Sequence, residues 1–166
     1  MQKNAGNQLR LEDSPEEVIR FYSDMVYRLA FARTGTRYDA DDFYEEVFLR
    51  YLKKKPKFKS EEHRRAWLLR VTINCSNSFL TSAWQRRVQE LPADLPFQQP
   101  EDYQLYDQLQ QLSAKYRSVI HLFYYEEMSV EEISEILHRK PSTVRTQLTR
   151  AREQLRKILK EEDYDF

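Results

Sequence analysis

Residues 129–158 read SVEEISEILHRKPSTVRTQLTRAREQLRKI, and this stretch predicts two helices separated by a tight turn. The hydroxyl of Ser129 can accept the amide of Glu132 while the Glu132 carboxylate reaches back to the Ser129 amide, the reciprocal capping box that starts a helix. Pro141 has no amide hydrogen and disfavours helix at the residue before it, so a first helix ends near His138 and a second begins just after the proline. A short helix, a turn and a long helix form the helix-turn-helix arrangement.

The second of these helices has one apolar face and otherwise basic faces. The apolar residues recur every three or four positions, at Val144, Leu148, Ala151, Leu155 and Ile158. Residues 138–160 contain eight lysines and arginines against a single acid. A basic run alone more often marks a solvated helix face. The capped partner helix favours DNA binding instead, with the second helix in the major groove.

Composition limits the chain to one or two small helical domains. It has 166 residues, 33% of them charged, and only two glycines, which also excludes a glycine-rich phosphate loop. The formal net charge is zero, but the charges are segregated along the chain. Residues 39–46 hold five acids and no base, 53–87 hold ten bases and two acids, and 101–137 hold eight acids and two bases. This alternation predicts two separate DNA-facing surfaces.

Several functions are disfavoured by what the sequence contains. The single cysteine, Cys75, allows no disulfide within the chain and predicts a reducing compartment. No apolar run reaches membrane-spanning length and no signal-peptide core is seen, so we expect a cytoplasmic protein without membrane insertion. The three histidines share no ligand spacing and no nucleophile comes with a base, so we expect no enzyme, metal or cofactor.

The remaining sequence predicts an all-α fold of two parts. Helix signals cover residues 15–33, 39–52 and 61–84, and the third and most apolar of these should lie at the centre of an N-terminal bundle. Residues 88–102 contain three prolines and no helical period, which predicts a flexible linker. Helices over 103–111 and 113–125 then precede the helix-turn-helix. The expected parts are a bundle at 13–87, a linker at 88–102 and a helix-turn-helix domain at 103–160.

Two groups of motifs resemble one family. SVEEISEIL, PSTVRTQL and RAREQL resemble the fourth conserved region of bacterial sigma factors. DADDFYEEVFLRYL and HRRAWLLRVTIN resemble the second conserved region of sigma factors of the extracytoplasmic-function (ECF) type, within the sigma-70 family. The resemblance implies a transcription initiation factor that binds core RNA polymerase, recognises the −10 and −35 elements of promoter DNA and opens the duplex. It leaves open an anti-sigma factor as a further partner.

The resemblance assigns the −35 element to the helix-turn-helix. Its DNA-binding residues are expected to be Ser142, Thr143, Arg145, Thr146, Thr149 and Arg150. Arginine suits the two acceptors of guanine, and threonine can offer a hydroxyl or meet the thymine methyl. The first amides of the helix can hold a phosphate.

The resemblance assigns the −10 element to the end of the N-terminal bundle. The expected residues are Phe58, Lys59, Arg70, Asn74, Ser78, Arg86 and Arg87, with Arg64 and Arg65 as further candidates for phosphate contacts. An unstacked base needs an aromatic or apolar platform and polar groups that read its edge. Phe58 is equally compatible with a loop residue turned into the core, and Trp67 is expected to be a core residue.

The acidic helix is expected to bind core polymerase. The residues that match the family here are Asp39, Asp41, Asp42, Glu45, Glu46 and Arg50. The same acids also suit the positive end of a helix dipole, and a metal site is a third interpretation.

Two other functions remain possible for this sequence, and the charge pattern adds one expectation. A two-domain helix-turn-helix regulator would bind duplex DNA without polymerase, and a helical interaction module would not bind DNA at all. The acidic stretch 101–137 can approach the basic block 53–87 in the free protein. We therefore expect masking of DNA-binding surface, so that the full chain binds promoter DNA worse than its C-terminal part.

Overall fold

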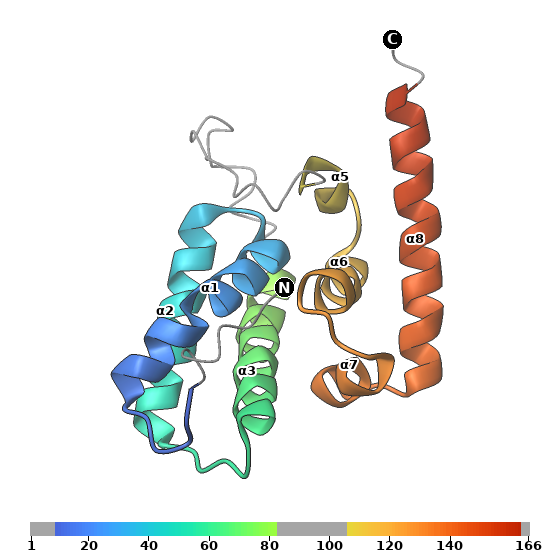
Figure 1. Ribbon diagram of the computed structural model, residues 1–166. Coiled ribbons are helices and arrows are strands. Elements are labelled where there is room, and N and C mark those ends of the chain that lie inside the picture. Colours follow the sequence, from blue (N-terminus) through green and yellow to red (C-terminus); the bar gives the residue numbers. More distant parts are fainter. Residues whose placement is uncertain (1–8, 83–105, 164–166) are drawn as a thin grey trace.

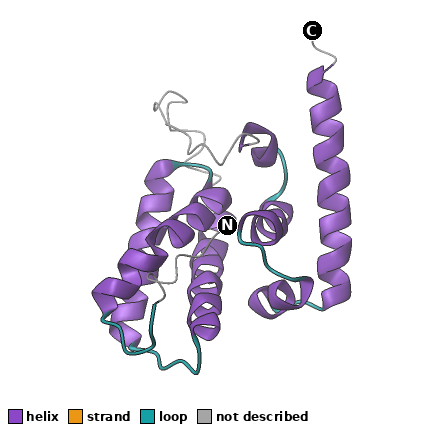
Figure 2. Ribbon diagram, viewed as in Figure 1, coloured by secondary structure: helices purple, strands orange, loops and turns teal. Residues whose placement is uncertain are grey.

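The computed structural model describes residues 9–82 and 106–163. Within these ranges every regular element is a helix and no strand occurs (Figure 1, Figure 2). The predicted all-α class is confirmed. The expected linker at 88–102 lies outside the described residues.

Three helices form the N-terminal bundle: α1 (Pro15–Thr34), α2 (Arg37–Lys54) and α3 (Glu61–Ser82). Ser14 caps α1 by accepting the amide of Glu17 at 3.3 Å, as its sequence predicts. Gly35 ends the helix in the left-handed conformation with φ 79°, a region that glycine enters without a Cβ clash. The largest fully buried side chains of the bundle are Val18, Val26, Leu29, Val47, Leu68 and Leu69.

The C-terminal part consists of α5 (Tyr106–Gln110), α6 (Ala114–Ile120), the π-helix η1 (His121–Tyr125), α7 (Val130–Leu137) and α8 (Pro141–Asp163). The single helix expected over 113–125 is wrong in its last five residues. There the backbone widens to π geometry, with the amide of Glu126 donating to the carbonyl of His121 at 3.1 Å. The wider turn places His121 and Leu122 in the core, and Phe123 is only half-buried.

The two parts pack against each other. The buried apolar residues of all these helices belong to one continuous cluster, although the sequence predicts two parts. Helix α3 lies beside α7, and α1 beside α6, while α8 packs on α5, α6 and α7 at the outer edge (Figure 1). The chain thus brings the basic helix α3 and the acidic segment around α7 together.

Candidate nucleic-acid interface

The predicted capping box and turn are both present in the helix-turn-helix. The Ser129 hydroxyl accepts the amide of Glu132 at 3.1 Å, and the Glu132 carboxylate accepts the amide of Ser129 at 3.3 Å. The turn is made by His138, which ends α7 in the left-handed conformation with φ 53°. A non-glycine residue costs about 1 kcal/mol there. Its amide is satisfied by the carbonyl of Ser134.

Helix α8 presents the expected reading residues to solvent. Val144, Leu148 and Ala151 are buried on its inner side. All six residues assigned to the −35 element are exposed, namely Ser142, Thr143, Arg145, Thr146, Thr149 and Arg150. The geometry fits a helix that enters a DNA groove with its outer face.

Hydrogen bonds within α8 define what its threonines offer. The hydroxyls of Thr146 and Thr149 donate to the carbonyls of Ser142 and Arg145, each at 3.0 Å. Their protons are therefore used inside the helix, and each side chain presents a methyl group and an acceptor oxygen outward. Arg145 lies 3.4 Å from the exposed carboxylate of Glu131 on α7, a weak pair that a guanine can replace.

The residues assigned to the −10 element fall into two environments. Lys59 and Asn74 are exposed. Phe58 is turned toward its own bundle, with its ring stacked on Tyr51 at 6.4 Å and edge-on to Trp67 at 5.9 Å. The structure thus favours the core role for Phe58. Trp67 is half-buried, so the expected core position is only partly reached.

The arginines of α3 contact protein. Arg64 is 3% exposed and is bound by Glu61 at 2.8 Å and by the carbonyl of Leu11 at 2.9 Å, so its expected phosphate role is wrong for this conformation. Arg65 donates to the carbonyl of Glu126 at 2.7 Å, and Arg70 to that of Glu135 at 3.1 Å. The side chain of Ser78 and both Arg86 and Arg87 lie outside the described residues.

One of the acidic residues of α2 is buried at the start of the helix, and the others lie on its exposed face. Asp39 is 1% exposed and belongs to the helix start, where Thr36 accepts its amide at 3.2 Å and donates to its carboxylate at 2.7 Å. Asp39 therefore does not face solvent, in contrast to the expected role in polymerase binding. The other assigned residues are all exposed: Asp41, Asp42, Glu45, Glu46 and Arg50.

Sequence reasoning missed an apolar contribution to this exposed face. Leu49 is 46% exposed and lies one turn from Glu45 and Glu46, and Leu52 is 41% exposed. Glu46 and Arg50 pair at 2.9 Å beside them. Helical spacing from Asp42 could have revealed this mixed face. No cluster of three histidine, cysteine or acidic side chains placed to hold a metal occurs in the described ranges.

Comparison with known proteins identifies both parts of the chain. Sigma-70 region 2 matches residues 18–86, and Sigma-70 region 4 matches residues 102–155. An RNA polymerase sigma-E factor of Streptomyces avermitilis is 31% identical over 160 residues, covering 90% of this chain and 87% of the relative. The chain belongs to the sigma-70 family of RNA polymerase sigma factors.

Other relatives place this sigma factor in the ECF type. The ECF RNA polymerase sigma factor SigE of Mycolicibacterium smegmatis is 31% identical over 87% of this chain, which spans 61% of that relative's length. The ECF RNA polymerase sigma factor SigW of Bacillus subtilis is 28% identical, covering 90% of this chain and 91% of the relative.

A solved sigma factor shares the fold. The structure of RpoE from Bartonella quintana, determined in complex with the anti-sigma factor NepR, superposes with a TM-score of 0.72 at 21% identity. The match covers 87% of this chain and 96% of RpoE. In this sigma factor none of the described helices has the length and apolar character that crossing a membrane requires.

One further residue of this sigma factor escaped sequence reasoning. Arg152 is exposed on α8, where its Nε donates to the hydroxyl of Tyr124 at 2.6 Å and its guanidinium lies 5.3 Å from the ring of Phe123. This arrangement fixes an arginine next to the reading face. The only signal in the sequence was its basic charge, which it shares with most of α8.

Proposed function

We propose that this chain is a transcription initiation factor that binds core RNA polymerase and directs it to specific promoters through −10 and −35 contacts. The observation that carries the proposal is the outer face of α8, whose arginines and threonines are exposed to solvent on a helix that packs on the core with its opposite side. The matches to Sigma-70 region 2 in the N-terminal part and to Sigma-70 region 4 in the C-terminal part support the same role for that helix.

Each surface has a role in this proposal. Residues 13–87 form the domain for polymerase binding and −10 recognition, 88–102 the linker, and 103–160 the domain for −35 recognition. The −35 contacts are made by the exposed residues of α8. The −10 contacts come from Lys59, Arg70 and Asn74 on α3 and the loop before it, with Ser78, Arg86 and Arg87 as their continuation.

The exposed face of α2 is the polymerase-binding surface. It combines acids, Arg50 and the apolar Leu49, a mixture that gives both charge complementarity and buried area on binding. A factor with this role acts where the polymerase is, in the cytoplasm, and performs no catalysis of its own. An anti-sigma factor is a further proposed partner.

In vitro transcription tests the proposal. Core polymerase, this chain and a genomic fragment carrying the chain's own upstream region are combined, and transcripts and permanganate-reactive thymines are mapped. A sigma factor gives a defined start site and unpaired thymines only when core polymerase is present. Tight binding to the fragment without polymerase, with no thymine exposed in either reaction, would instead identify a DNA-binding regulator.

A further inference from the structure

The contact between the two parts is centred on a buried carboxylate. Glu126 follows the π-helix, and its side chain is 4% exposed. Its oxygens lie 3.5 Å from Arg28 on α1 and 3.4 Å from Arg65 on α3, and its backbone carbonyl accepts a second contact from Arg65 at 2.7 Å. His121 supports the same carboxylate at 3.2 Å. One acid of the C-terminal part therefore holds two arginines of the N-terminal bundle.

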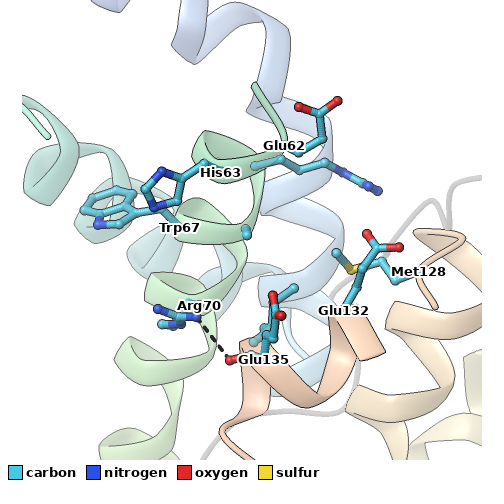
Figure 3. A pocket seen from close by; sticks show the side chains of 10 residues that line it. Glu62, His63, Trp67, Arg70, Met128, Glu132 and Glu135 are labelled. Carbon is cyan, nitrogen blue, oxygen red and sulfur yellow. Dashed lines mark hydrogen bonds between the residues drawn. The ribbon is translucent and has the colours of Figure 1, made fainter. Parts of the chain in front are cut away.

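Helix α7 extends this contact along α3. Figure 3 shows Arg70 of α3 reaching the backbone of Glu135 on α7, across a cavity of about 400 Å³. Trp67 and His63 line the α3 side of this cavity, and Met128 lines the opposite side. Two of the basic side chains that α3 offers to nucleic acid, Arg65 and Arg70, are thus engaged by protein.

The contact also contains a buried cation. Besides the cavity, it includes Arg33, which is 4% exposed and whose side chain donates to the neutral groups Ser76, Asn77 and Ser118. Among the described residues no carboxylate pairs with Arg33, and Arg117 donates to its carbonyl at 3.1 Å. Burial, together with the nearby charges of Arg117 and Arg139, lowers the pKa of Arg33 to about 10. A buried cation that no carboxylate neutralises weakens an interface.

We propose that Glu126 latches a closed form of the chain, in which α7 and the single-stranded −10 element compete for the same side of α3. This inference rests on the proposed function for the identity of the nucleic acid. The closed form leaves the outer face of α8 exposed. The latch therefore blocks binding of the −10 element and leaves binding of the −35 element unchanged. The masking expected from the charge pattern thus acts on α3. The full chain should therefore bind duplex −35 DNA as tightly as its C-terminal part, in contrast to the weaker binding that the charge pattern predicted.

The test compares two neighbouring acids in the full chain. Glu126→Gln keeps the shape of the side chain and removes the charge that Arg28 and Arg65 share, whereas Glu127→Gln makes the same change at an exposed position. Small-angle X-ray scattering measures the radius of gyration without polymerase or DNA. Expansion of Glu126→Gln alone supports the latch, and equal radii for the two variants and the wild type overturn it.

A binding measurement reports the competition. The probes are a fluorescent 20-nucleotide oligothymidine and a duplex of the chain's own upstream region. If closure limits the binding-competent fraction, Glu126→Gln binds the oligothymidine about tenfold more tightly and the duplex unchanged. Equal oligothymidine affinity for Glu126→Gln and Glu127→Gln would refute the competition. The scattering experiment contains neither polymerase nor promoter. It therefore tests the latch even if the proposed function is wrong.

A second variant tests the latch if Glu126→Gln does not fold. Arg28→Gln removes the same ion pair from the opposite side, with Arg20→Gln on the exposed side of α1 as its control. Arg28→Gln also removes a positive charge, so tighter oligothymidine binding by this variant cannot come from added attraction. Circular dichroism confirms helix content first. Expansion with tighter binding supports the latch, and behaviour equal to Arg20→Gln contradicts it.

Discussion

Arg145 and Arg150 stand on the side of α8 that the core does not use, because Val144, Leu148 and Ala151 hold the helix from its opposite side. Truncating either arginine leaves this packing intact. We expect Arg145→Ala and Arg150→Ala each to weaken duplex −35 binding by about 1–3 kcal/mol, the worth of one base-reading contact. Fluorescence anisotropy with the polymerase complex measures the loss.

Lys160→Ala is the matched control for these two variants. It removes one positive charge from the exposed surface near the far end of the same helix. If Lys160→Ala weakens duplex binding as much as the two variants do, α8 contributes only non-specific attraction to the DNA charge.

Asp39 shows a different role for an acid of the same segment. Its carboxylate and amide both bond to Thr36 at the start of α2. Asp39→Ala should lower the stability of the fold by about 1 kcal/mol through loss of the hydrogen bond from the Thr36 hydroxyl to the Asp39 carboxylate, and Asp42→Ala should not, since Asp42 is exposed. Thermal unfolding of both variants measures the difference. Equal melting temperatures would show that this hydrogen bond contributes nothing.

Residue-level prediction worked where helical spacing decides exposure, as for the outer face of α8. It did not work for Asp39 or Arg64. Both look like surface charges in the sequence. The partner of Asp39 is local, since Thr36 lies three residues before it, whereas the partner of Arg64 is the carbonyl of Leu11, which is distant in the sequence. A charged residue's partner depends on where the rest of the chain returns.

At the scale of a single element, α2 carries one exposed face with acids, a base and leucines. Reversing Asp42, Glu45 and Glu46 to lysine should reduce retention of core polymerase, because the charge complementarity of that face is inverted. The fold should persist, since none of the three is buried. A pull-down with purified core polymerase measures the effect.

Reversal of Asp24, an exposed acid of α1, serves as the control for this experiment. Duplex binding by α8 should be unchanged in both proteins. Normal polymerase retention by the triple variant would leave these acids with no role beyond the helix start.

Helix ends were predictable wherever a cap is local. Ser14, Gly35 and Ser129 each act within three or four residues, so their sequence neighbourhood contains the whole interaction. The π-helix was not predictable, because the five residues from His121 to Tyr125 carry an ordinary apolar pattern. Its wider turn accompanies the burial of Leu122 and His121 in the shared core, which involves residues distant in the sequence.

At the scale of the whole molecule, closure should depend on pH. Burial works to raise the pKa of Glu126, but the hydrogen bond with His121 and the charges of His121, Arg28 and Arg65 outweigh it and hold the pKa below the ordinary value of 4.5. A lowered pKa stabilises the closed form above pH 4.5, and this contribution is lost as the pH falls through the closed-form value.

The groups that face Glu126 are therefore Arg28 from α1, Arg65 from α3 and His121 from η1. The radius of gyration of the wild type should increase as the pH falls below 4.5 and through the lowered closed-form pKa of Glu126. Glu126→Gln should lack this step, as its radius is already larger at pH 7. A wild-type radius that stays constant over this range would contradict the expectation.

The packing of the two parts was only partly visible in the sequence. The opposite charges of the segments 53–87 and 101–137 predicted an approach. The charge counts did not identify Glu126 as the centre of the contact between the two parts. They also did not show that Arg33 and Arg117 are buried in it. These residues are distant in the chain, and a buried arginine looks the same in sequence as a solvated one.

The π-helix has a consequence for changes in chain length. Glu126 reaches Arg28 and Arg65 because η1 closes its turn with a hydrogen bond between residues five apart, one residue more than in an α-helix. Deleting one residue between His121 and Tyr125 would wind this turn as α-helix and rotate the following carboxylate by about 100° around the axis. No charge would be lost and the capping box at Ser129 would remain. A protein of this architecture can thus change how firmly it holds itself closed through a single-codon deletion, with its DNA-reading helix untouched.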